Sequence, residues 1–152
     1  MKAEIYYLVY ISTAIKLFKD EDLMPLLDQS RRYNQERGIS GLLLYAEGCF
    51  IQIIEGQKQR VKNLFSQKIC KDARHHSMIL MVEGSEPDRS FPEWSMGFQS
   101  MRRNALSSNI PGFTKILGEG NSPHESYPEV SAKILALLKS FYKTTGLRRH
   151  YE

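Results

Sequence analysis

The sequence predicts an α+β fold, in which helices pack against an antiparallel sheet. Short runs of β-branched and aromatic residues alternate with two segments of helical periodicity. Two of these runs are separated only by Glu47 and Gly48, which predicts a hairpin. The resulting order is βαββαβ plus one strand. Right-handed crossovers then predict a ferredoxin-like sheet with two helices on one face.

Length and composition favour one globular domain with a short appendage. The chain has 152 residues, of which 41% are hydrophobic and 25% are charged, and both fractions are ordinary for a soluble protein. No apolar run is long enough to span a bilayer. The N-terminus has no signal-peptide pattern, so we expect a cytoplasmic protein that does not bind membranes.

Charge and cysteine content point to no particular chemistry. The formal net charge of +4 is mild, and a solvated surface is a simpler explanation for it than an acidic partner. Cys49 and Cys70 are too few for a disulfide framework, so we expect reduced thiols in the core.

The first strand is predicted at Ile5–Ile11, where every residue is β-branched, aromatic or leucine. Side chains alternate between the two faces of a strand. One face therefore carries Tyr6, Leu8 and Tyr10, and the other carries Ile5, Tyr7, Val9 and Ile11. Because both faces are apolar, we expect both to be covered.

The first helix is predicted from a cap at Asp20 or Asp22 to about Arg37, with Gly38 as its stop. Pro25 is expected in its first turn, where proline is tolerated. The inward stripe at helical spacing consists of Leu23, Leu27, Ser30 and Asn34.

The hairpin joins predicted strands at Ile39–Ala46 and Cys49–Glu55. The second strand contains one amide, Gln52, within an apolar run that ends at Gly56. A buried carboxamide needs hydrogen-bond partners and offers both a donor and an acceptor on one rotatable group. Alternatively, Gln52 lies on an edge and points to water.

A second helix is predicted at Gln59–Cys70, with Val61, Leu64, Phe65, Lys68 and Ile69 on its apolar side. Lys68 is the unusual member of this stripe. Such a lysine usually extends to water, and less often meets a buried anion or carbonyl.

Two further strands are predicted, at Met78–Val82 and Ser95–Met101. A polar turn at 72–76 precedes the first, and a loop at 84–93 separates the two. Trp94, Met96 and Phe98 share one phase of the period-two pattern.

Residues 102–152 are predicted to form a C-terminal helical extension. Its main helix is expected at Ser126–Lys143, where Val130, Ile134, Leu137, Leu138 and Phe141 form an apolar side. This helix could cover the second face of the sheet or mediate assembly.

Polar side chains are expected to meet between the two helices. If Tyr10 and Gln52 face the same way as Trp94 or Met96, they form a cluster with Asn34 and Lys68 among apolar residues. Unpartnered buried polar groups cost about 1–3 kcal/mol each. The cluster therefore suggests a flat polar ligand with an apolar body. A network of core residues that satisfy one another is the alternative, and periodicity does not decide between them.

Five stretches of the chain resemble the BLUF domain, a blue-light sensor that uses a flavin. They occur in the family's order and at its separations, over roughly residues 4–100. The stretches are Leu8-Val-Tyr10-Ile-Ser12, Asn34-Gln-Glu-Arg-Gly-Ile-Ser-Gly41-Leu-Leu-Leu-Tyr45, Gly48-Cys-Phe-Ile-Gln52-Ile-Ile-Glu-Gly56, Asp72-Ala-Arg-His-His76 and Phe91-Pro-Glu-Trp94-Ser-Met96-Gly-Phe98. Each is weak alone, and together they are specific.

The resemblance implies a flavin between the two helices. Tyr10 and Gln52 would be its photoactive pair, Asn34 would bond its polar edge, and Trp94 and Met96 would relay the signal. The remaining residues implied to lie near the ring or its ribityl chain are Lys68, Asp72, Arg74, His75 and Met96. The helix before Asp72 is one residue longer than the family pattern, so Gln67 competes with Lys68 for its position.

The implied function is that of a photoreceptor and not of an enzyme. Residues 1–101 would form the flavin-binding photosensor, and residues 102–152 would form the extension. FAD is the expected cofactor, with FMN and riboflavin as alternatives. The output would go to a separate signalling protein, and we expect a homo-oligomer.

Two other functions fit a small α+β domain less well. An RNA-binding module would need basic and paired aromatic residues on an open sheet, and Cys49–Glu55 has neither. A small enzyme, including a flavin-dependent one, would need a nucleophile and base or a paired-carboxylate set, and no such motif is evident. The neighbours His75 and His76 point in different directions, so a metal site is not expected.

Overall fold

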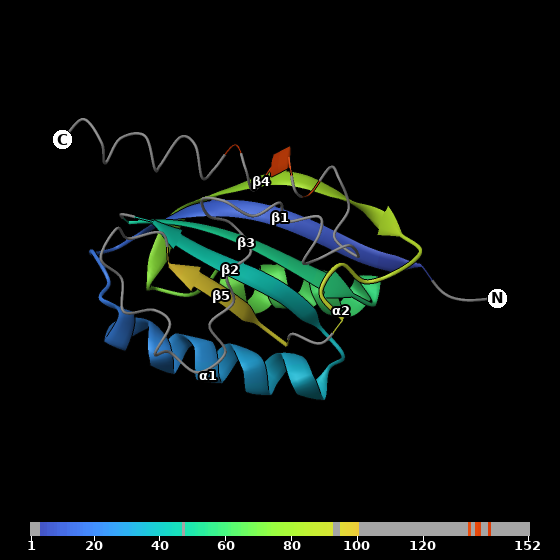
Figure 1. The fold of residues 1–152 in the computed structure, drawn as a ribbon, viewed down its shortest axis with the longest axis horizontal. Coiled ribbons are helices and arrows are strands. Elements are labelled where there is room, and N and C mark those ends of the chain that lie inside the picture. The colour runs from blue at the N-terminus through green and yellow to red at the C-terminus, as the bar shows by residue number, and fades with distance from the viewer. Residues whose placement is uncertain are drawn as a thin grey trace, which may run out of the picture.

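The computed structural model describes residues 4–46, 48–92 and 95–100, together with residues 134, 136, 137 and 140. The described chain forms one five-stranded sheet in the order β4-β1-β3-β2-β5 (Figure 1). In chain order the elements are β1 (Ile5–Ala14), α1 (Asp20–Glu36), β2 (Ser40–Ala46), β3 (Cys49–Gly56), α2 (Lys58–Asn63), the π-helical segment η1 (Leu64–Ile69), β4 (His75–Glu86) and β5 (Gly97–Ser100). The first four strands are antiparallel, and β5 runs parallel to β2. The ferredoxin-like prediction is confirmed.

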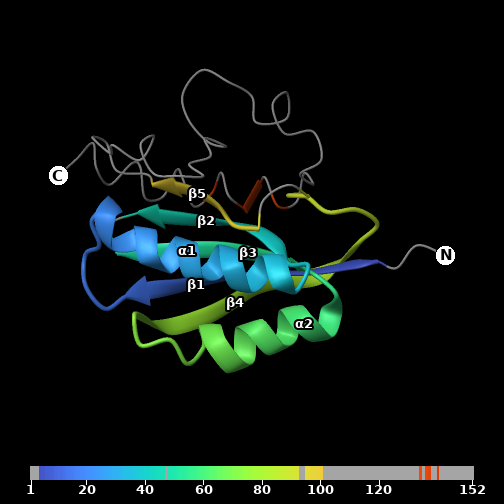
Figure 2. The same ribbon diagram turned by 90° about the horizontal axis from the view of Figure 1, so that it is seen from below.

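Both helices cover the same face of the sheet, as predicted (Figure 2). Tyr6, Leu8 and Tyr10 pack in the core on the helix side. Tyr7 and Val9 belong to a separate apolar cluster on the other face. The alternation expected along β1 is therefore confirmed.

Most of the predicted C-terminal extension lies outside the described residues. Of its apolar side, the structure describes Ile134 and Leu137. Ile134 is buried in the apolar cluster on the second face of the sheet, and Leu137 packs against that cluster. A covering role for residues 102–152 stays a prediction.

The ends of α1 are close to the predicted ones, but the cap residue is Lys19 and not Asp20 or Asp22. The helix begins at Asp20, and the carboxylate of Asp22 accepts a hydrogen bond from Lys19 N at 3.0 Å. At the other end Gly38, with a φ of 63°, lets the chain turn out of the helix. Pro25 is the sixth residue of the helix and not in its first turn, so the helix loses one internal hydrogen bond there.

The second helix differs from the prediction because its last part is π-helical. Cys70 N donates to Phe65 O at 2.8 Å, which is a π-type bond between residues five apart. A π turn holds one residue more than an α turn. The thiol of Cys70 is exposed and that of Cys49 is half-buried, so the core placement expected for both is wrong.

The strand predicted at Met78–Val82 is more than twice as long in the structure. β4 has 12 residues, and polar residues near both of its ends pair with β1. Pairing along the whole of β1 outweighs the low strand preference of glycine and glutamate. β1 itself continues to Ala14, and β5 begins only at Gly97, so Ser95 and Met96 lie in a bend before it.

A buried carboxylate at the end of β3 fastens the loop between β4 and β5. Glu55 is 1% exposed. It accepts hydrogen bonds from Ser40 Oγ at 2.7 Å, from Ser90 N at 2.8 Å and from Phe91 N at 2.8 Å. The strand pattern gave no sign of this role, because the donors lie far along the chain.

We expect Glu55→Gln to lower the free energy of unfolding by about 1–3 kcal/mol. Three donors converge on the two carboxylate oxygens, and an amide replaces one oxygen with an NH2 group that repels them. Urea denaturation measures the difference. Glu36→Gln is the control, because the Glu36 side chain is 75% exposed and should change stability little. Equal urea midpoints for Glu55→Gln and the parent would contradict the prediction.

Candidate functional site

The sheet, α1 and η1 enclose a cavity of about 360 Å³. This volume lies in the range of small-molecule sites. Of the residues proposed from sequence, the cavity is lined by Tyr10, Asn34, Gln52, Gln67, Lys68, Asp72, Arg74 and His75. Trp94 lies outside the described residues, and Met96 does not line the cavity but contacts Gln52, which does. The structure therefore brings the predicted cluster together.

Tyr10 and Gln52 form the floor of the cavity. They are directly opposite one another on β1 and β3. Tyr10 is 3% exposed and Gln52 is 6% exposed. The Tyr10 hydroxyl donates a hydrogen bond to Gln52 Oε1. Because β3 lies between β1 and β2, the alternative that placed Gln52 on an edge is wrong.

Burial raises the pKa of the Tyr10 phenol well above its usual value, and the nearby Asp72 carboxylate raises it further. The phenol therefore stays protonated at neutral pH. Its ring packs against Phe65, with ring centroids 5.4 Å apart. Tyr10 thus presents a fixed, neutral hydroxyl donor to the amide.

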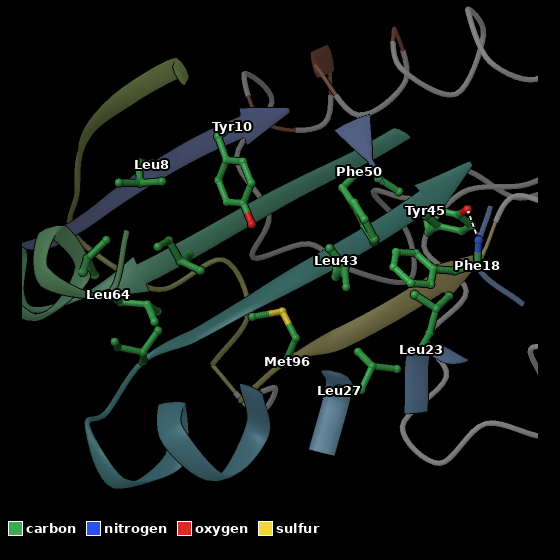
Figure 3. Close-up of a cluster of buried hydrophobic side chains, with 14 of the residues drawn as sticks. Leu8, Tyr10, Phe18, Leu23, Leu27, Leu43, Tyr45, Phe50, Leu64 and Met96 are labelled. Carbon is green, nitrogen blue, oxygen red and sulfur yellow. Dashed lines mark hydrogen bonds between the residues drawn. The ribbon is translucent and has the colours of Figure 1, made fainter. Parts of the chain in front are cut away.

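The other end of the Gln52 amide reaches Met96. Gln52 Nε2 donates to Met96 Sδ at 3.3 Å. The side chains of Tyr10 and Met96 belong to the same core cluster, on the side of the sheet that the helices cover (Figure 3). Thioether sulfur is a weak acceptor, so this bond costs little to exchange for another. The amide is held at both ends, strongly at its oxygen and weakly at its nitrogen.

Asn34 is a buried polar residue whose amide the described residues do not fully satisfy. Its side chain is buried, and Nδ2 donates to Ser95 O at 2.7 Å. Within the described part of the chain, Asn34 Oδ1 has no hydrogen-bond partner. Leaving such an oxygen unpaired costs about 1–3 kcal/mol. This observation favours a bound ligand with an N–H donor over a network of core residues that satisfy one another.

Asp72 and Arg74 form an ion pair at the rim. Arg74 Nη2 lies 2.5 Å from Asp72 Oδ2, and it also donates to Gln29 Oε1 on α1 at 3.1 Å. Burial raises the pKa of Asp72, but the hydrogen bonds and charge of Arg74 outweigh it and hold the pKa below its usual range. The stabilisation from this pair is therefore present at neutral pH and is lost as pH falls through the lowered pKa.

Lys68 and Gln67 both line the cavity from η1, and they differ in their partners. Lys68 Nζ lies 4.0 Å from the centroid of the Tyr33 ring on α1. Gln67 Oε1 accepts a hydrogen bond from Lys71 Nζ at 3.1 Å. Lys68 therefore reaches toward α1, whereas Gln67 is engaged within its own segment. Lys68 remains our choice for contact with a ligand.

Both nitrogens of His75 are occupied by protein groups. Nε2 lies 2.8 Å from Ile69 O, and Nδ1 lies 2.8 Å from Ser12 Oγ. A carbonyl only accepts, so Nε2 donates to Ile69 O, while Nδ1 and Ser12 Oγ share one hydrogen bond. His75 would meet a ligand with its ring and not with a hydrogen bond. No group of three metal-binding side chains occurs among the described residues.

Sequence reasoning missed several residues around the cavity. These are Leu26, Gln29, Leu43, Phe50, Leu64 and Lys71 as lining residues, and Arg31 as a partner of Met96. Leu26 lies four residues before Ser30 on α1, and Gln29 lies four residues before Tyr33, so helical spacing could have found them. The bond of Arg31 to a main-chain carbonyl carries no sequence signal.

Comparison with known proteins identifies the family. Residues 5–97 match the family of sensors of blue light using FAD, abbreviated BLUF. The chain is 34% identical over 160 residues to the photoactivated adenylate cyclase subunit beta of Euglena longa, in a match that covers 92% of this chain and 18% of that protein. The chain thus spans less than a fifth of this relative.

Solved structures agree. The dark-state structure of BlrB, a BLUF protein, has a TM-score of 0.61 at 32% identity and covers 73% of this chain and 82% of its own. The photo-activated state of BlsA has a TM-score of 0.60 at 29% identity, and the match covers 81% of this chain and 91% of BlsA. Within the described residues, no helix is long and apolar enough to cross a bilayer. The chain belongs to the BLUF family of flavin-using blue-light sensors.

Proposed function

We propose that the cavity between α1 and η1 holds the flavin and that Tyr10, Gln52 and Met96 convert its excitation into a structural change. The observation that carries this proposal is the buried chain of hydrogen bonds from the Tyr10 hydroxyl through the Gln52 amide to Met96 Sδ. This chain of hydrogen bonds ends on a thioether sulfur, which is a weak acceptor. It can therefore switch at that end without disturbing the core.

The cavity residues fit the flavin in chemistry as well as in size. The unpaired Asn34 Oδ1 would accept from an N–H group at the polar edge of the ring. Leu43 and Phe50 offer apolar surface to a flat body. Lys68, Asp72, Arg74 and His75 would lie toward the ring or the ribityl chain. FAD is our first choice, as the family description implies, and FMN or riboflavin would satisfy the same contacts.

A flavin excited by blue light supplies a strong oxidant. Tyr10 would give it one electron and pass the hydroxyl proton to Gln52 Oε1, and both would return to Tyr10. The raised pKa of Tyr10 makes loss of the proton without the electron unfavourable, so we expect the two to leave together. Gln52 would be left rotated or tautomerised, and its Nε2 group would no longer bond Met96.

The size of this change suits a switch. Exchanging one or two buried hydrogen bonds is worth about 1–3 kcal/mol. That alters a population ratio roughly tenfold to a hundredfold. It is far below the stability of a typical domain, so the fold would persist.

Met96 and Trp94 would carry the change onward. Met96 lies directly before β5, and β5 leads into residues 102–152. The solved structure of a bacterial light-regulated adenylyl cyclase is 26% identical to this chain, with a TM-score of 0.64. The match covers 97% of this chain and 36% of the cyclase chain. For this chain we propose a sensor that converts no substrate itself. It would act in the cytoplasm as a homo-oligomer and pass its signal to a separate protein.

Absorption spectroscopy tests the proposal. The purified chain should be yellow, and blue light should move its flavin absorption to longer wavelength, reversibly in the dark. Mass spectrometry of the released pigment identifies the flavin, and pull-downs in light and darkness identify the partner. A chain that binds no added flavin, or a bound flavin that a substrate bleaches, would contradict the proposal.

A further inference from the structure

We propose that Arg31 is a positioning residue for the light response: it holds the main chain of Met96 so that the sulfur meets Gln52, and so governs the return to the dark state. The inference deepens the proposed function and rests on it. It starts from a contact in which neither partner is a cavity-lining side chain.

Two consecutive carbonyls before β5 are bonded to α1. Arg31 Nε donates to Met96 O at 2.9 Å, and Asn34 Nδ2 donates to Ser95 O at 2.7 Å. Arg31 and Asn34 lie three residues apart, so they share one face of the helix. The main chain at 95–96 is thus fastened to α1, while the Met96 side chain reaches Gln52 on β3.

The Arg31 contact is stronger than an ordinary hydrogen bond. The guanidinium stays charged in proteins, and a charged donor makes a hydrogen bond roughly twice as strong as a neutral one. Burial lowers the pKa of Arg31 and the Asp28 carboxylate opposes this, but neither removes the charge. By comparison, the Gln52–Met96 bond ends on a weak sulfur acceptor.

The other end of the loop is also fixed. Glu55 accepts from the main-chain N–H groups of Ser90 and Phe91. The segment from Ser90 to Met96 is therefore held by a carboxylate at one end and by α1 at the other. Of the contacts that hold this segment, only the bond from Gln52 Nε2 to Met96 Sδ depends on how the Gln52 amide is turned.

This arrangement gives Arg31 a defined role in the cycle. When Gln52 turns, Met96 Sδ loses its donor while Met96 O keeps Arg31. The main chain at Met96 keeps its position, so Met96 Sδ stays close to the place where it accepts from Gln52. Without Arg31, the main chain at 95–96 can adopt more conformations. The bond between Gln52 Nε2 and Met96 Sδ then re-forms more slowly.

The test compares Arg31→Gln with the matched control Arg32→Gln, which removes the same charge from an exposed neighbour on the same helix. We expect Arg31→Gln to keep the light-induced absorption shift and to slow dark recovery by about threefold to tenfold, the effect of part of one charge-assisted hydrogen bond. Arg31→Lys, which retains a charged donor, should recover at an intermediate rate. Lysine also serves as the second variant if glutamine does not fold.

A second readout does not need the flavin. Trp94 is the only tryptophan and lies two residues before Met96 in the sequence. In the flavin-free chain of 152 residues, acrylamide should quench Trp94 fluorescence more strongly in Arg31→Gln than in the parent, and Arg32→Gln should match the parent. Equal recovery and equal quenching in the two variants would overturn the inference. A parent chain without any light-induced shift would instead refute the proposed function, and the quenching comparison would still decide whether Arg31 holds the segment.

Discussion

Gln52→Leu will retain the flavin and lose the light-induced absorption shift completely. Leucine fills a similar volume but has no group to accept from the Tyr10 hydroxyl or to donate to Met96 Sδ. Both ends of the hydrogen-bonded chain are broken, so no rearrangement remains for light to drive. Because Asn34 and the rim residues are untouched, flavin binding should survive. Absorption spectra before and after blue light give the result.

The buried Tyr10 hydroxyl also loses its acceptor in this variant. That should cost about 1–3 kcal/mol of folding free energy, so urea denaturation has to accompany the spectra. The control is Gln59→Leu, which removes an exposed amide on α2 whose bond to Asn63 lies outside the cavity lining. A normal shift in Gln52→Leu would remove Gln52 from the mechanism.

The sequence left open whether Tyr10 and Gln52 face the same way, and the pairing of β1 with β3 places them directly opposite one another. Both lie in long apolar runs. Within one strand, side chains alternate between the two faces, so the sequence tells which residues of that strand share a face. Helical spacing likewise brought Asn34 to the inner side of α1. The placement of Asn34 could be predicted because it depends only on local periodicity, whereas the shared orientation of Tyr10 and Gln52 also depends on how their two strands pair.

What the sequence did not predict depends on contacts between distant residues. Glu55 meets Ser90 and Phe91 some 35 residues along the chain, and Arg31 meets Met96 across 65 residues. In each case one partner is a main-chain group, and every residue type has one. No choice of side chain at position 90 or 96 reveals that its N–H or carbonyl is used.

The π-helical segment shows a different limit. The apolar stripe from Val61 to Ile69 predicts a helix, but it does not tell an α turn from a π turn, because both keep apolar residues on the same side over so short a span. The turn type determines where Gln67 and Lys68 point. The competition between them could therefore be described from sequence but not decided.

Tyr10→Phe will bind flavin and show no stable absorption shift. Phenylalanine keeps the aromatic ring, whose centroid lies 5.4 Å from that of Phe65 in the parent, so the cavity wall should be unchanged. It has no hydroxyl proton to pass to Gln52 Oε1. Without that proton transfer, the Gln52 amide should keep its bond to Met96 Sδ. Steady-state spectra under blue light, together with the dark-recovery trace, measure the loss.

Tyr7→Phe is the matched control for this variant. Tyr7 is as buried as Tyr10, at 3% exposed, and lies on the same strand but faces the apolar cluster on the other side of the sheet. Losing its hydroxyl should leave the shift in place. If Tyr10→Phe cycles like the parent, the electron and proton must come from another side chain. If both variants lose the shift, the effect belongs to the packing of β1 and not to the hydroxyl beside Gln52.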